Sequence, residues 1–69
     1  MKNNIKVERA RHNFTQADLA KKIQVSRQTI NAMEAGKYIP STLLSLKLAE
    51  VFQVEVSGLF QLEKKDWKK

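Results

Sequence analysis

Two helix-start signals lie close together in the first half of this chain. Thr15 is followed three residues later by Asp18, and such a pair opens a helix because each side chain can bond a free backbone N–H group of the other residue. Ser26 is a second capping residue, and only two residues separate it from the end of the apolar periodicity that follows Thr15. The spacing predicts a helix over about 16–23, a tight turn, and a second helix over about 27–35.

The remaining signals are also helical. Helix-forming residues over 4–13 predict a first helix that stops at Asn13, and Gly36 ends the helix that Ser26 opens. Pro40 cannot continue a helix, so a loop precedes a fourth helix that Ser41 or Thr42 opens and that runs to about residue 52. A last short helix is expected to begin near 55–57. Strand signals are nearly absent, which predicts an all-α fold of five helices.

Size and composition limit what else the chain can be. Its 69 residues contain no cysteine, so disulfides and thiolate zinc sites are excluded and a single core must come from helix packing, assisted by dimerisation. No apolar run is long enough to span a bilayer and the first residues lack a signal-peptide core, so we expect a cytoplasmic protein with no membrane contact.

The charge balance favours a polyanionic partner. Thirteen Lys and Arg against seven Asp and Glu give a net charge of +6, which attracts polyanions over a long range. The basic residues are dispersed rather than gathered on one amphipathic helix, so nucleic acid is favoured over an anionic membrane. Four of the last six residues are lysines, and two roles stay open for them: a solubilising tail or a phosphate contact.

Catalytic and cofactor chemistry have no basis in the sequence. His12 is the only histidine, no acidic cluster has metal-ligand spacing, and no glycine-rich phosphate loop is present. No serine or threonine has an identifiable activating pair. We therefore expect no metal, no cofactor and no enzymatic activity.

The predicted helix over 27–35 carries base-reading chemistry. Its apolar residues Ile30 and Met33 share one face, so four side chains must point elsewhere: Arg27, Gln28, Asn31 and Ala32. Arginine can bond guanine with two hydrogen bonds, glutamine can pair with adenine, and the alanine methyl can touch a thymine methyl. Thr29 is better placed for a phosphate or a base at the rim.

Three stretches in this register resemble the Cro/C1-type helix-turn-helix family, also called the Xre family. They are Phe14 to Ala20, Val25 to Asn31, and Glu34 to Lys37 with Pro40, and the resemblance extends over about residues 5–60. It implies a compact five-helix, lambda-repressor-like DNA-binding domain over 1–60, followed by a short tail over 61–69. It also implies contacts to double-stranded DNA by Gln16, Ser26, Arg27, Gln28, Thr29, Asn31 and Lys37, and a partly buried ion pair between Arg9 and Glu34.

Several residues depart from the pattern of this family. Asn13, Gln24 and Gln53 stand where glycine is common, and each of the two glutamines would cost roughly 1 kcal/mol if its backbone stays left-handed. Glu8 replaces a leucine that usually faces the core, and Thr42 and Ser45 occupy positions that are commonly apolar or small. Val7, Ala10 and Phe14 share the other face of the first helix; such a stripe most often joins the core, and contact with a partner is the alternative.

The tail offers a candidate for self-association. Phe60, Leu62 and Trp67 could form a dimer contact, for example through a short strand across the two-fold axis. The alternative is a frayed tail in which Trp67 packs loosely on its own subunit.

Together these observations predict a sequence-specific regulator of transcription, a repressor that acts as a homodimer on a pseudo-palindromic operator. The competing hypothesis is a partner-binding subunit such as an antitoxin, with or without DNA binding. A nonspecific nucleic-acid coat is disfavoured because the second helix of the pair carries more than lysines.

Overall fold

The helices follow one another with short connections, and two very short strands join the ends of the helical body. The computed structural model describes residues 1–68, so Lys69, the last residue of the predicted tail, lies outside the described residues. Its elements, in chain order, are β1 (Lys2–Asn3), α1 (Ile5–Arg11), α2 (Gln16–Ile23), α3 (Arg27–Glu34), α4 (Thr42–Phe52), α5 (Val56–Leu59), β2 (Phe60–Gln61) and a 3₁₀ helix, η1 (Lys64–Trp67). The five-helix prediction is therefore confirmed, and the first helix is shorter than the expected 4–13.

Side-chain caps fix where three of the helices begin. The Thr15 hydroxyl accepts from the Asp18 backbone N–H at 3.0 Å, and Asp18 Oδ2 accepts from the Thr15 N–H at 2.9 Å. Ser26 accepts from Thr29 N at 3.1 Å, and Ser41 accepts from Leu44 N at 3.2 Å. Each bond satisfies a backbone donor that the first helical turn would otherwise leave unpaired.

Three helix ends adopt left-handed backbone conformations without glycine. Asn13, Gln24 and Gln53 have φ values of 58°, 62° and 55°. Side chains with a Cβ atom disfavour this region by roughly 1 kcal/mol relative to glycine. The expected cost therefore applies at Gln24 and Gln53, whereas asparagine at position 13 tolerates this region.

A single core lies between the helices. Its ten buried apolar residues are Ile5, Leu19, Ala20, Ile23, Ile30, Met33, Leu48, Ala49, Phe52 and Leu59. The expectation that Val7 and Ala10 join this core is wrong: Val7 is 56% exposed and Ala10 is exposed, because α1 turns Ile5 and Glu8 inward instead. Phe14, the third member of that stripe, is half-buried against the core.

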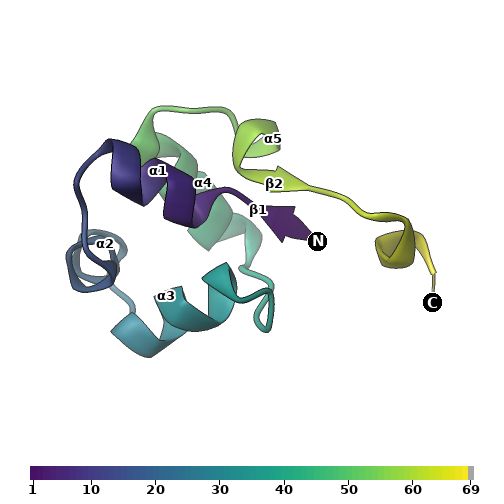
Figure 1. Ribbon diagram of the computed structural model, residues 1–69, viewed down its shortest axis with the longest axis horizontal. Helices are drawn as coiled ribbons and strands as arrows, with labels where there is room; N and C mark the ends of the chain where they lie inside the picture. Colours follow the sequence, from purple (N-terminus) through teal and green to yellow (C-terminus); the bar gives the residue numbers. More distant parts are fainter. Residues whose placement is uncertain (69) are drawn as a thin grey trace.

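A small sheet ties the two ends of the described chain together. β1 pairs with β2 in antiparallel register, Lys2 opposite Gln61 and Asn3 opposite Phe60, although strand signals are nearly absent from the sequence. Asn4 N donates to Leu59 O at 2.8 Å, and the Asn3 amide donates to Met33 O at 2.9 Å. Two-residue strands show no periodicity, so only tertiary contacts reveal them. The sheet leads into an extended segment that carries η1 away from the helices (Figure 1).

No helix within residues 1–68 is both long and apolar enough to cross a bilayer.

Candidate nucleic-acid interface

The packing of α2 on α3 decides which face of α3 reaches solvent. Leu19 and Ile23 of α2 and Ile30 and Met33 of α3 are all buried, so the two apolar faces meet. The turn between the helices is closed by a 2.9 Å bond from Val25 N to Ala20 O. Figure 1 shows α3 along the lower edge of the molecule, below α1 and α4. One side of α3 is thus held by the core and the other is free.

The free side of α3 carries the predicted base readers. Arg27, Gln28 and Asn31 are exposed, and Ala32 and Thr29 are half-buried beside them. These groups offer a guanidinium, two carboxamides, a methyl group and a hydroxyl, the functional groups that distinguish base edges in a major groove. A helix of this diameter fits that groove, so the arrangement can read bases directly.

Ser26 uses its side chain within the protein. Besides capping α3, its Oγ lies 2.9 Å from Thr29 Oγ1, so the two hydroxyls bond each other. Ser26 therefore orders the first turn of α3, whose free backbone N–H groups attract anions. This turn presents Arg27 and Gln28 next to those N–H groups.

Gln16, the first residue of α2, lies against the middle of α3. Its Nε2 donates to Asn31 Oδ1 at 3.3 Å and to Glu34 Oε1 at 3.2 Å. The start of α2 and a candidate base reader are thus held side by side. Gln16 is half-buried.

Arg9 and Glu34 form an ion pair that links α1 to α3. Arg9 Nε donates to Glu34 Oε2 at 2.6 Å and Arg9 Nη2 donates to Oε1 at 3.1 Å, while Nη1 donates to the Phe14 carbonyl at 3.0 Å. The two side chains are only 15% and 9% exposed. The hydrogen bonds to Glu34 raise the pKa of the Arg9 guanidinium. These three bonds direct the Arg9 guanidinium toward Glu34 and the Phe14 carbonyl, so Arg9 links α1 to α3.

Lys37 lies just beyond α3, in the loop to α4. Its backbone N donates to Ala32 O at 2.9 Å, and its side chain is exposed. Gly36 precedes it with a φ of 76°, the left-handed helix ending expected of glycine. The ammonium group of Lys37 is therefore free to meet a phosphate at the end of α3.

Comparisons with known proteins agree with this geometry. A family model described as helix-turn-helix matches residues 5–59. The chain belongs to the Cro/C1-type helix-turn-helix family. This family consists of DNA-binding regulators of transcription and is not a class of enzymes.

Small relatives and a solved structure share the domain. An uncharacterized helix-turn-helix-type regulator of Methanocaldococcus jannaschii is 56% identical over 63 residues, covering 91% of this chain and 96% of its own. The YgzD regulator of Bacillus subtilis is 41% identical, covering 96% and 100%. The solution structure of the SOS-response transcriptional repressor LexA from Eubacterium rectale superposes with a TM-score of 0.78 at 34% identity, covering 88% of this chain and 65% of that one.

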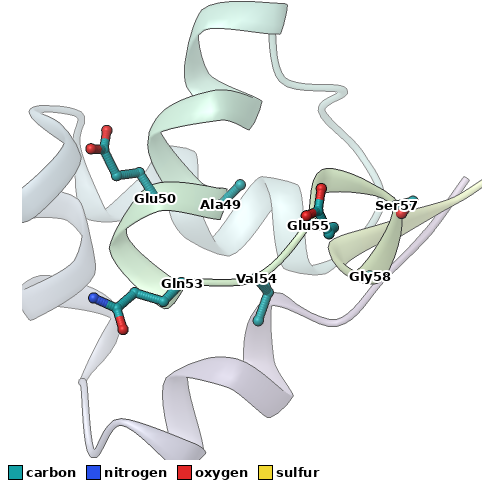
Figure 2. A pocket seen from close by; sticks show the side chains of 7 residues that line it. All are labelled: Ala49, Glu50, Gln53, Val54, Glu55, Ser57 and Gly58. Atoms are coloured by element: carbon teal, nitrogen blue, oxygen red, sulfur yellow. The ribbon is translucent and has the colours of Figure 1, made fainter.

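The face formed by α4 and α5 differs in charge from the helix-turn-helix face. A shallow groove of about 850 Å³ lies between these helices, and its lining includes the apolar Ala49 and Val54 and the acidic Glu50 and Glu55 (Figure 2). Both glutamates are exposed, and neither takes part in an ion pair among residues 1–68. Negative charge repels phosphate, so this groove is an unfavourable surface for DNA.

The three predicted dimer-contact residues lie in different surroundings. Phe60 is half-buried in β2 and packs on the core of its own chain, whereas Leu62 is 61% exposed and Trp67 is 76% exposed. Trp67 belongs to η1, an ordered turn rather than a frayed tail. The strand formed by Phe60 and Gln61 pairs with β1 of the same chain.

Sequence reasoning missed a second group of exposed apolar residues. Ile39 in the loop and Leu43 and Leu46 on α4 are 67%, 63% and 56% exposed. Leu43 and Leu46 are three residues apart and therefore share one face of α4. The signal was available: leucines at positions 43, 44, 46 and 48 surround α4 on more sides than one core can cover.

His12 follows the last residue of α1 and lies beside two aromatic rings. Residues 1–68 contain no group of three His, Cys, Asp or Glu side chains that could hold a metal ion. The imidazole is exposed, its Nδ1 lies 2.9 Å from the Glu8 carbonyl, and its ring lies 5.5 Å from Phe14 and 5.4 Å from Phe52 between centroids. It covers one edge of the aromatic part of the core.

Proposed function

We propose that this chain is a cytoplasmic homodimeric repressor that reads a pseudo-palindromic DNA operator through α3. The observation that carries the proposal is the free face of α3, where Arg27, Gln28 and Asn31 are exposed while Arg9, Gln16 and Glu34 hold the helix in place. The family is one of DNA-binding regulators, and the solved neighbour from Eubacterium rectale is named a transcriptional repressor.

A dimer is proposed because one domain of this size makes few base contacts. Two linked domains add their binding through effective concentration, and half-sites one helical turn apart lie roughly 34–36 Å from each other. Exposed apolar side chains are available for the dimer interface: Leu62, Trp67, Ile39, Leu43 and Leu46. Burial of these apolar side chains in an interface is favourable in free energy, which is not so for the polar face of α3.

The first experiment is selection of bound duplexes from a random DNA library at about 150 mM salt, where weak backbone binding is substantially screened. Enrichment of an inverted repeat supports a dimeric sequence-specific regulator. Absence of any enriched sequence contradicts the proposal.

Substitutions then test the role of each residue. Gln28→Ala is expected to change the preferred base at one position of the half-site, with a loss of about 1–3 kcal/mol on the original sequence. Lys37→Ala is expected to weaken binding to all duplexes alike. Lys6→Ala, at an exposed lysine of α1, is the matched control. Equal losses on operator and random DNA for Gln28→Ala would contradict its assignment to a base.

A partner-binding subunit, such as an antitoxin, is the second candidate function. The exposed Leu43 and Leu46 support this candidate, because an exposed apolar helix face can bind a different protein as well as a second copy of this chain. Sedimentation of the purified chain separates the two: a homodimer at micromolar concentration supports the repressor, and a stable one-to-one complex with another protein, isolated from native extract, supports the partner-binding subunit.

A further inference from the structure

The η1 turn separates its charges onto different faces. A 3₁₀ helix has three residues per turn, so residues three apart lie above one another. Glu63 and Asp66 therefore share one face, and Lys65 and Lys68 share another. Lys64 and Trp67 form the third.

The acidic face of the turn is directed at the protein. The Met1 ammonium lies 2.9 Å from Glu63 Oε1 and 3.2 Å from Asp66 Oδ2, and Asp66 Oδ2 also accepts from Glu63 N at 2.7 Å. The hydrogen bond from the ammonium lowers the pKa of Glu63, and the bond to the Glu63 backbone lowers the pKa of Asp66. The two acidic side chains are only 33% and 18% exposed.

The basic face is directed at solvent. The side chain of Lys65 is 74% exposed and makes only a long 3.8 Å contact with Glu63, and Lys68 is exposed. Since the acidic groups are engaged by Met1, the outer surface of the turn carries positive charge.

This turn lies next to the loop that follows α3. A cavity of about 160 Å³ separates them, with Gly36, Tyr38 and Ile39 among its lining residues on one side and Lys65 and Asp66 on the other. Lys37, the proposed phosphate contact, belongs to the same loop. Figure 1 shows η1 on the side of the molecule to which the C-terminal end of α3 points.

We propose that Lys65 and Lys68 form a second contact with the DNA backbone, next to Lys37 and beyond the bases that α3 reads. This inference rests on the proposed DNA binding of α3. The duplex presents one phosphate charge per roughly 1.7 Å of its axis, so a basic face beside the end of a groove-bound helix meets further phosphates. The tail thereby lengthens the footprint without adding sequence information.

The salt dependence of binding tests the contact. Anisotropy of a labelled 30-base-pair duplex of random sequence is measured over a series of KCl concentrations for the full chain. Each phosphate contact contributes about 0.9 to the slope of log K against log salt, so Lys65→Gln/Lys68→Gln is expected to lower the slope by about 2 for each bound chain, and by about 4 for the proposed dimer. Lys6→Gln/Lys47→Gln, which removes the same charge from α1 and α4, is the matched control and leaves the slope unchanged.

Each outcome has a definite meaning. An unchanged slope in the tail variant, or equal changes in both variants, overturns the tail contact while DNA binding by α3 stands. Loss of dimer in sedimentation with an unchanged slope overturns it in favour of a protein contact. Failure of the unmodified chain to bind duplex even at low salt overturns the proposed function itself.

A positional probe gives an independent reading. Because the chain contains no cysteine, Lys65→Cys provides a unique attachment point for iron-EDTA, which cleaves the DNA backbone near it. Cleavage of the selected duplex beside the α3 half-site supports the contact, and Glu55→Cys on the acidic groove is the control without cleavage. Absence of cleavage from position 65 overturns the proposal.

Discussion

Replacing Glu8 by leucine should make this domain more stable. Glu8 is 7% exposed, its Oε1 is buried without a hydrogen-bond partner, and its Oε2 has only a 3.4 Å contact with Arg11 Nη1. A buried polar atom without a partner costs about 1–3 kcal/mol, because it has lost its bonds to water and gained none. The Arg11 side chain is 69% exposed, so its ion pair returns little of that cost.

The size of the effect follows from these contacts. Leucine removes the unpaired oxygen and adds apolar surface to a site that faces the core, so we expect the free energy of unfolding to rise by about 1–3 kcal/mol. In a domain of this length each kcal/mol shifts the melting temperature by about 4–8 °C. Glu8→Gln removes the charge but keeps a polar group in the same place, so its gain should be smaller.

Urea unfolding followed by circular dichroism measures the change. The order Glu8→Leu above Glu8→Gln above the unmodified chain, with similar slopes in urea, is the expected result. Glu50→Leu, at an exposed glutamate of α4, is the control and should stay within about 0.5 kcal/mol. A Glu8→Leu chain no more stable than the unmodified one would refute the reasoning, since it would mean that Oε1 carries no cost.

Three further predictions concern backbone strain, the ion pair and pH. Gln24→Gly and Gln53→Gly should each raise the free energy of unfolding by roughly 1 kcal/mol, because both residues have left-handed backbones. The control Gln61→Gly, in the extended β2, should not raise it. An equal rise for Gln61→Gly would contradict the argument. Glu34→Ala leaves the largely buried Arg9 without its partner and should cost several kcal/mol in thermal unfolding, whereas Glu55→Ala should cost little. Hydrogen bonds from Thr15 lower the pKa of Asp18. The stability that Asp18 adds by capping α2 is therefore fully present above about pH 4, the ordinary aspartate pKa, and is lost as pH falls through the lowered pKa. Acid unfolding of Asp18→Asn should lack this loss, and identical acid unfolding of the two chains would contradict the prediction.

Local chemistry explains which parts of the fold could be predicted from sequence. The starts of α2, α3 and α4 follow from Thr15, Ser26 and Ser41, because a capping bond involves residues only three apart. The β1–β2 pairing joins residues about sixty positions apart and depends on where α5 places Phe60. No local pattern encodes that distance.

The candidate DNA-binding site likewise combines features that the sequence predicts with features that depend on the fold. The identities of Arg27 and Gln28 and the periodicity of α3 indicate which side chains leave the core. The bonds of Gln16 to Asn31 and Glu34 depend on how α2 crosses α3, which spacing alone does not give. Likewise, the lysines of the tail are evident from the sequence. The pairing of Glu63 and Asp66 with the Met1 ammonium is not, because the β1–β2 sheet brings Met1 beside the tail.

The amide of Gln16 restricts the freedom of a candidate base reader. Its nitrogen donates to Asn31 Oδ1 at 3.3 Å and to Glu34 Oε1 at 3.2 Å, and Glu34 is paired in turn with Arg9. The orientation of the Asn31 carboxamide is therefore coupled, through Gln16, to the ion pair that joins α1 to α3. An amide oxygen can accept two hydrogen bonds, so Asn31 keeps an acceptor for a base while its side chain already has a preferred rotamer. Less side-chain entropy then remains to be lost when α3 meets the proposed DNA operator.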